Sequence, residues 1–262
     1  MNTHIHTRRT GSGATVLCLH GLGSASRSYD SLFGAAGPFH CVAWDAPGFG
    51  ESADPSGGAT IEWYAERAAE VIAELGTGPV HVLGNSWGGL IAMQLAVTEP
   101  DLVKSLVVVA SSTGYAADPA AAERLLTASD QLTKLGPAAF AKEHAARLLS
   151  PNASDDAISG LSADIQQDVR QLGFAAAVDS MVAVDVTRTV KSIHKPTLIL
   201  WGDADQMTDQ ESSQGIANAI PDAVFVTLAG AGHIPHVEKA DSCRAWLTSF
   251  FRIVDNDRET SF

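Results

Sequence analysis

A serine between two glycines is the first feature of this chain that suggests chemistry. It lies in the segment VHVLGNSWGGLIAMQLA, residues 80–96, which begins with β-branched, apolar residues and ends with helical spacing. At such a strand-to-helix corner a serine can be held in a strained, exposed conformation and act as a nucleophile. Gly84 and Gly88, two residues to either side, permit a tight turn and a close approach of the helix to the strand. Ser86 is therefore the candidate nucleophile.

A histidine late in the chain is the candidate base. A serine hydroxyl is a weak nucleophile unless a base accepts its proton, and the base needs a third group that fixes its tautomer and stabilises its charged form. His233 lies in the small-residue loop AGAGH, directly after a strand-like run. His236 follows three residues later, as in a zinc-binding pair, but no cluster of further ligands accompanies it. We expect His233 to be the base, and we predict no metal and no cofactor.

Two aspartates compete to be the third group, in the segment WGDAD at the end of another strand-like run. Asp203 lies next to the strand end, where aspartate commonly organises a turn through local hydrogen bonds. Asp205 lies further out on the loop. We therefore favour Asp205 as the partner of His233.

The loop HGLGS, which begins at His20, is the expected second half of an oxyanion hole. The negative oxygen that forms when serine attacks a carbonyl needs backbone N–H donors that already point at it. We expect one donor from Trp87, directly after the serine, and one from Leu22 in this loop. A glycine pair after a strand also occurs in dinucleotide sites, but Ser26 stands where the third glycine of that fingerprint belongs.

The elements that must position these residues alternate along the chain. A helix is predicted over residues 60–75, with Thr60 as its N-cap and Gly76 as its end. A closing helix over 241–251 and a frayed polar tail over 255–262 are also predicted. Such alternation is typical of an α/β fold, a mostly parallel sheet with helices on both faces and functional loops at the carboxyl ends of the strands. The predicted strands are residues 14–20, 40–45, 79–83, 105–110, 195–201 and 223–228.

The alternation stops near Tyr115, and an alanine-rich stretch with helical periodicity follows. We predict three or four short helices there, with breaks at Gly136, Ser150 and Gly173. These helices are interpreted as an inserted cap. The predicted division of the chain is a core domain in two parts, residues 1–114 and 193–262, with a helical cap over 115–192.

Substrate choice is expected to depend on this cap, because a lid shapes the pocket over a generic reaction centre. Arginines can hold a carboxylate with two parallel hydrogen bonds, although cap arginines are more often solvated. Apolar cap residues can line a pocket, although their helical spacing favours packing within the cap. The candidates are Arg124, Arg147, Arg170 and Arg188, and Phe140, Phe174 and Met181.

Composition excludes several classes of protein. The chain has 262 residues, of which 45% are hydrophobic and 18% charged, as in an ordinary globular domain. The formal net charge of −13, from 17 basic and 30 acidic residues, disfavours nucleic acid as a partner. No apolar run reaches the length of a membrane span and no signal-peptide pattern opens the chain, so we expect a cytoplasmic protein without membrane contacts. A small-molecule substrate is the expected partner, and a homo-oligomer is left open.

These motifs together resemble the α/β-hydrolase superfamily along nearly the whole chain. The segments that carry the resemblance are HGLGS, DAPGFGES, GNSWGG, WGDAD and GAGHIPHVE. The resemblance implies a triad of Ser86, Asp205 and His233, an oxyanion hole from the amides of Leu22 and Trp87, and a helical cap. The chain is most similar to small capped members such as 3-oxoadipate enol-lactonases, meta-cleavage product hydrolases and related esterases.

The expected activity is hydrolysis of a small ester, enol-lactone or related carbonyl compound through an acyl-enzyme, without a cofactor. Ser86 departs from haloalkane dehalogenases and epoxide hydrolases, which carry an aspartate there, and HGLGS departs from the HGGPG of proline iminopeptidases. Three alternatives stay open: hydrolysis of a C–C bond in a meta-cleavage-type dienoate, a ligand receptor with slow turnover, and cofactor-independent oxygenase chemistry.

Overall fold

A computed structural model describes residues 4–34 and 38–259 of the chain, arranged around one seven-stranded sheet. The strand order is β1-β3-β2-β4-β5-β6-β7. Every neighbouring pair is parallel except β1 and β3, which pair antiparallel. The predicted α/β fold is confirmed. The strands are β1 (Thr7–Thr10), β2 (Ala14–Leu19), β3 (Phe39–Trp44), β4 (Val80–Asn85), β5 (Val103–Val109), β6 (Thr197–Gly202) and β7 (Val224–Leu228).

The sheet is buried on both faces, which explains why its inner strands are continuous apolar runs. In β2 successive residues point to opposite faces: Leu17 and Leu19 belong to one apolar cluster, and Val16 and Cys18 to the other. Strand β1 was not predicted. Its sequence TRRT is short and charged, as suits an edge strand that faces solvent.

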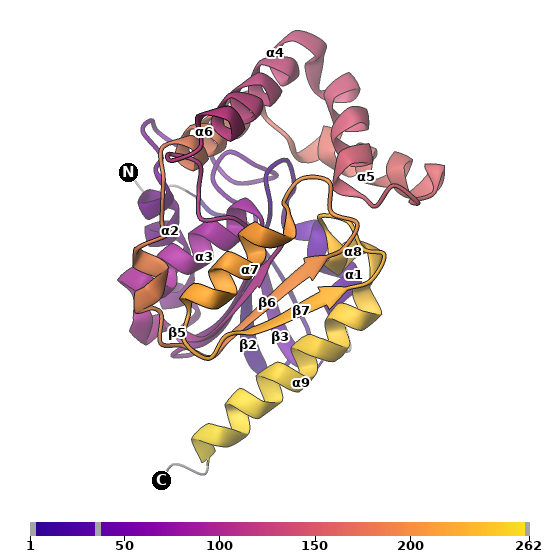
Figure 1. The fold of residues 1–262 in the computed structure, drawn as a ribbon. Helices are drawn as coiled ribbons and strands as arrows, with labels where there is room; N and C mark the ends of the chain where they lie inside the picture. Colours follow the sequence, from indigo (N-terminus) through magenta and orange to yellow (C-terminus); the bar gives the residue numbers. More distant parts are fainter. Residues whose placement is uncertain (1–3, 35–37, 260–262) are drawn as a thin grey trace.

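Helices cover both faces of the sheet (Figure 1). One face carries α2 (Ile61–Leu75), α3 (Trp87–Thr98) and α7 (Gln210–Ala219), and the other carries α1 (Asp30–Phe33), α8 (Pro235–Glu238) and α9 (Ala240–Glu259). Helix α2 has the predicted bounds. The Thr60 hydroxyl accepts a hydrogen bond from the backbone N–H of Trp63 at 3.2 Å, and Gly76 ends the helix at φ 62°.

The predicted frayed tail is wrong over the residues that the structure describes. Helix α9 continues to Glu259 and does not end near residue 251. It is anchored by Asp255, whose carboxylate accepts hydrogen bonds from the Lys104 ammonium group and from His81 Nε2 at 3.1 Å. Residues 260–262 lie outside the described part. A polar composition alone did not reveal that the helix carries an anchoring carboxylate.

The remaining helices gather over one end of the sheet (Figure 1). They are α4 (Pro119–Leu148), α5 (Asp155–Asp168) and α6 (Gln171–Val182), whereas the short 3-10 helix η3 (Thr189–Ser192) packs against α3 and α7. Helix α4 is kinked at Gly136, where φ is 76° and ψ is 165°, as the Gly-Pro pair predicted. The cap boundaries at residues 115 and 192 stay a prediction.

Gly173 does not break a helix, which corrects the prediction made for it. It lies in the first turn of α6, and the chain between α5 and α6 is extended at Val169 and Arg170. A Cβ at Gly173 would overlap the backbone of Gly48, so the glycine serves a close approach between α6 and the loop after β3. Among the described residues, no helix combines the length and apolarity needed to cross a membrane.

Candidate active site

Ser86 stands at the corner between β4 and α3 in a strained backbone conformation. Its φ is 53° and its ψ is −117°, a region that residues with a side chain rarely occupy. The two flanking glycines make the corner possible. A Cβ on Gly84 would overlap the carbonyl of Gly88, and a Cβ on Gly88 would overlap the carbonyl of Leu19 in β2. Strain of this kind is found where a side chain must be presented to a ligand.

Asp205 and His233 meet although 28 residues separate them along the chain. Asp205 lies in the loop after β6 and His233 in the loop after β7, and His233 Nδ1 is 2.9 Å from Asp205 Oδ2. The Asp205 side chain is fully buried, and its Oδ1 accepts hydrogen bonds from the backbone N–H groups of Met207 (2.7 Å) and Thr208 (3.1 Å). An ionised carboxylate only accepts, so this contact places the ring proton on Nδ1 and leaves Nε2 with its lone pair.

Asp203 makes a different contact. Its Oδ1 accepts a hydrogen bond from the backbone N–H of Gly230 at 2.6 Å, and its side chain is exposed. The two aspartates of the WGDAD segment therefore have different partners. Asp203 ties the loop after β6 to the loop after β7, and Asp205 carries the contact with the imidazole of His233.

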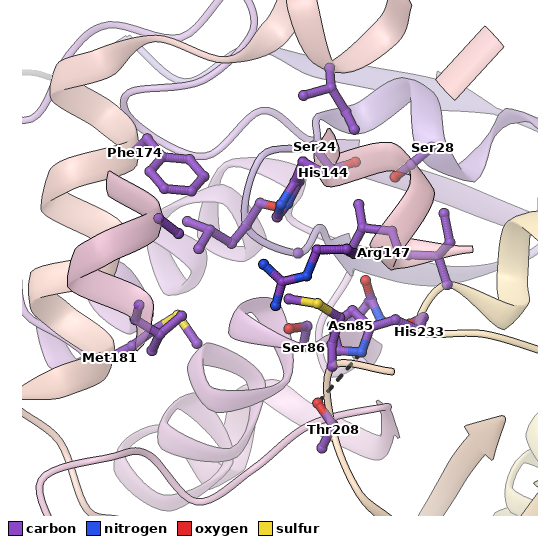
Figure 2. A pocket seen from close by; sticks show the side chains of 18 of the residues that line it. Ser24, Ser28, Asn85, Ser86, His144, Arg147, Phe174, Met181, Thr208 and His233 are labelled. Atoms are coloured by element: carbon purple, nitrogen blue, oxygen red, sulfur yellow. Dashed lines mark hydrogen bonds between the residues drawn. The ribbon is translucent and has the colours of Figure 1, made fainter. Parts of the chain in front are cut away.

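Ser86 and His233 line one cavity beneath the cap (Figure 2). The cavity together with its open mouth spans about 1000 Å³. Most of its lining is apolar. The apolar lining residues include Leu22, Leu125, Leu148, Leu161, Ile165, Phe174, Met181, Met207, Ile234 and Val237. Phe174 and Met181 thus contact both the cap interior and the cavity.

The two expected oxyanion-hole amides lie at the ends of well-anchored segments. Trp87 is the first residue of α3, and the first N–H groups of a helix have no partner within the helix. The loop with Leu22 is held by His20, whose Nε2 accepts from the N–H of Ala46 at 2.9 Å and whose Nδ1 donates to the carbonyl of Gly21 at 2.9 Å. Within residues 4–34 and 38–259, neither the Leu22 nor the Trp87 N–H has a hydrogen-bond acceptor.

Two further residues hold the site together and were missed from the sequence. The Asn85 amide donates to the carbonyl of Val109 at 3.2 Å and to that of His233 at 3.1 Å. The Glu238 carboxylate accepts from the N–H of Gly232 at 2.6 Å and from the N–H of Ser150 at 2.9 Å. Both contacts depend on tertiary structure. The signal available in the sequence was that Asn85 lies in the motif GNSWGG, next to Ser86, and that Glu238 lies in the motif GAGHIPHVE, which contains His233.

His236 does not act with His233 as a ligand pair. It is buried, its ring stacks on Tyr29 at 5.0 Å between centroids, and burial lowers its pKa to about 3. Within the described part of the chain, no three His, Cys, Asp or Glu side chains are gathered so that they could hold a metal ion. The cysteines take no part in the site: Cys18 and Cys41 lie 3.6 Å apart at their sulfurs in the core, and burial raises the pKa of Cys18.

Comparison with known proteins places this geometry in a family. The sequence profile of the family described as alpha/beta hydrolase fold matches residues 14–240. The chain belongs to the alpha/beta-hydrolase family. This hydrolase is similar to Lipase 1 of Psychrobacter immobilis, with 28% identity over 253 residues that cover 94% of this chain and 80% of the lipase. It is also similar to the pimeloyl-[acyl-carrier protein] methyl ester esterase of Aeromonas hydrophila, with 27% identity, covering 89% of this chain and 93% of the esterase.

Solved structures agree with this assignment. A thermophilic esterase from Thermogutta terrifontis, determined with malate bound, superposes with a TM-score of 0.88 at 27% identity, covering 96% of this chain and 94% of the esterase. The enol-lactonase of Burkholderia xenovorans LB400 superposes with a TM-score of 0.85 at 21% identity, covering 95% and 97%. The second likeness shows the fold alone.

Proposed function

We propose that this alpha/beta hydrolase is a serine hydrolase that cleaves a small carboxylic ester or lactone through a covalent acyl-enzyme. The observation that carries the proposal is the placement of Ser86, on a strained corner, in the same cavity as an imidazole whose Nδ1 is bonded to the buried Asp205. The lipase and methyl ester esterase that the chain is similar to support the same class of substrate.

The proposed first half-reaction forms a bond between Ser86 Oγ and the carbonyl carbon of the ester. His233 Nε2 takes the serine proton as the bond forms, and Asp205 stabilises the resulting imidazolium. The N–H groups of Leu22 and Trp87 donate to the oxyanion. When the C–O bond to the alcohol breaks, the alcohol oxygen takes the proton from His233 and leaves.

The second half-reaction returns the enzyme to its starting state. Water attacks the acyl carbon while His233 accepts one of its protons, and the same amides hold the second oxyanion. The acyl–serine bond then breaks, the proton returns to Ser86, and the carboxylic acid is released. In a lactone the alcohol and the acid are parts of one molecule, so a single hydroxy acid is the product.

Steady-state hydrolysis of short-chain nitrophenyl esters tests this proposal. Wild type should release nitrophenolate with saturation kinetics, and Ser86→Ala should lose several orders of magnitude in kcat. Turnover that is unchanged in Ser86→Ala would overturn the proposal. Tight binding of esters to wild type without any product would instead indicate a receptor on the same fold.

A further inference from the structure

The arginines that line the cavity are positively charged, whereas the chain as a whole is negatively charged. The chain carries 30 acidic and 17 basic residues. Yet the described residues that line the cavity include two arginines, Arg124 and Arg147, and no aspartate or glutamate. His144 also lines it, but burial lowers the pKa of its imidazole to about 4, so it is neutral at pH 7. The two formally charged side chains among the described lining residues are therefore both positive, in a protein that is acidic as a whole.

The two arginines also differ from the arginines that the fold uses for its own structure. Arg27 is paired with Asp168 at 2.9 Å, and Arg170 with Asp54 at 3.2 Å and with backbone carbonyls of the loop after β3. By contrast, Arg124 and Arg147 have no ion pair and no hydrogen-bond acceptor within the described part of the chain. Both residues are exposed while they line the cavity, so their guanidinium groups, each with five N–H donors, can be reached from solvent and by a ligand in the cavity.

The kink in α4 is what brings both arginines to one cavity. They are 23 residues apart, so a straight α-helix would separate them by about 35 Å along its axis. Gly136, at φ 76° and ψ 165°, divides α4 into two arms, and each arm contributes one arginine. Figure 2 shows the Arg147 side chain reaching from the cap into the cavity, with its guanidinium group on the side of Ser86.

We infer that Arg124 and Arg147 form a carboxylate-binding subsite, and that the substrate is an ester or lactone with a free carboxylate group. The inference rests on the proposed function, since it names the class of ester that the Ser86 site takes. The planar guanidinium fork matches the two oxygens of a carboxylate and can bond both of them. The apolar wall formed by Leu125, Phe174 and Met181 suits the carbon chain between the carboxylate and the reacting carbonyl.

This arrangement also orients the substrate. A carboxylate held at the cap arginines and a carbonyl held by the amides of Leu22 and Trp87 fix the two ends of one molecule, which places the ester carbon against Ser86. Arg124 and Arg147 act on specificity through binding, and they take no part in bond making. A neutral ester of the same length lacks the first of these two contacts.

Kinetics on matched substrates test the subsite. We compare the monomethyl and dimethyl esters of glutaric and adipic acids, in which the second carboxyl group is either a charged carboxylate or a neutral methyl ester, and we count kcat/KM per cleavable ester bond. Wild type should favour the half-ester over the diester by about 10- to 100-fold in kcat/KM, mainly through KM. Arg124→Ala and Arg147→Ala should each lower this ratio about tenfold or more, and Arg147→Lys should recover part of it. The preference should shrink at high salt.

Arg188→Ala is the matched control, because Arg188 is exposed, as Arg124 and Arg147 are, but does not line the cavity. It should keep the wild-type ratio. Equal kcat/KM for half-ester and diester in wild type, or a ratio that the Arg124 and Arg147 variants leave unchanged, would overturn the subsite while Ser86-dependent turnover continued to support the proposed function.

A binding measurement tests the subsite without turnover. Glutarate and inorganic phosphate are titrated calorimetrically into Ser86→Ala, and into the same variant with Arg147→Ala added. Glutarate should bind the single variant and bind at least about tenfold more weakly to the double variant. Failure of glutarate to bind would contradict the subsite. Binding of phosphate with equal affinity would contradict the carboxylate assignment.

Discussion

The side-chain amide of Asn85, the residue before the candidate nucleophile, donates a hydrogen bond to the backbone carbonyl of His233 at 3.1 Å. The same amide donates to the carbonyl of Val109 at the end of β5. One buried side chain therefore joins the corner that presents Ser86 to the loop that carries His233. The Asn85 amide therefore ties the backbone of His233 to the end of β5 in the core of the sheet.

Replacing Asn85 tests this link. Asn85→Ala leaves the His233 carbonyl without this donor, whereas the Val109 carbonyl keeps the hydrogen bond from the Ser86 N–H, so we expect a loss of about 1–3 kcal/mol in the free energy of unfolding. Displacement of His233 relative to Ser86 should lower kcat by about 100-fold. Asn152→Ala removes an exposed asparagine of the cap and is expected to change neither quantity. Wild-type kcat in a folded Asn85→Ala variant would contradict the role assigned to this amide.

The two aspartates after β6 give a paired test of the base. In Asp205→Asn an amide N–H can face Nδ1, which favours the tautomer with the proton on Nε2 and removes the lone pair that accepts the serine proton. We expect kcat to fall about 10⁴-fold with little change in thermal stability. Asp203→Asn keeps the Oδ1 that accepts from Gly230 and should retain most of the activity. Steady-state kinetics with equal losses in both variants would contradict the assignment.

Gly84 and Gly88, which flank Ser86 at the corner between β4 and α3, should tolerate no side chain. In Gly88→Ala the new Cβ meets the backbone carbonyls of Leu19 and His20, which cannot move aside as a side chain can, so we expect a destabilisation of about 3 kcal/mol. Gly160→Ala is the control, since this helical glycine of α5 has open space around it and alanine should stabilise it by up to about 1 kcal/mol. Denaturant unfolding of the two variants should give shifts of opposite sign.

A buried carboxylate between cap and core should make stability depend on pH. Asp168 ends α5, its side chain is 3% exposed, and it pairs with Arg27 at 2.9 Å. Burial raises the pKa of Asp168 to about 6, against the opposing effect of Arg27. The Asp168 carboxyl group keeps its proton up to a higher pH in the folded state than in the unfolded state. Its contribution to the free energy of unfolding is therefore fully present below pH ~4 and is lost as the pH rises through about 6.

His144 and His236 act in the opposite direction, because burial lowers their pKa values to about 4 and about 3. Their contribution is present above pH ~6.5 and is lost as the pH falls. Because both proteins contain the two histidines, the histidine contributions cancel when the free energy of unfolding of Asp168→Asn is subtracted from that of wild type. Relative to this variant, the wild-type free energy of unfolding should decrease between pH 4 and 6.5. A difference that is constant with pH would show that Asp168 does not titrate in this range.

Local patterns in the sequence were sufficient for the elements whose signals are local. Thr60 and Gly76 predicted both ends of α2, because a capping hydroxyl and a left-handed glycine act within one turn of the helix. The apolar runs predicted the six parallel strands, because a strand buried on both faces needs them. Gly173 was misread as a break, because a glycine needed for close packing has the same sequence signature as one needed for a turn.

The contacts that complete the site could not be read from the sequence. The choice of Asp205 over Asp203 followed from loop position, but the roles of Asn85 and Glu238 depend on carbonyls and amides that other segments bring near them. The predicted break at Gly136 was visible. The sequence did not show that this kink places Arg124 and Arg147 on one cavity, because their positions depend on the angle between the two arms of α4.

The most direct test of the central claim, that the environment of Ser86 makes its hydroxyl a nucleophile, is labelling with a fluorophosphonate followed by mass spectrometry of the intact protein and of its peptides. We predict one adduct per chain, on the peptide that contains Ser86, with labelling abolished in Ser86→Ala and slowed by orders of magnitude in Asp205→Asn. Equal labelling of wild type and Ser86→Ala, or an adduct on another residue, would contradict the account.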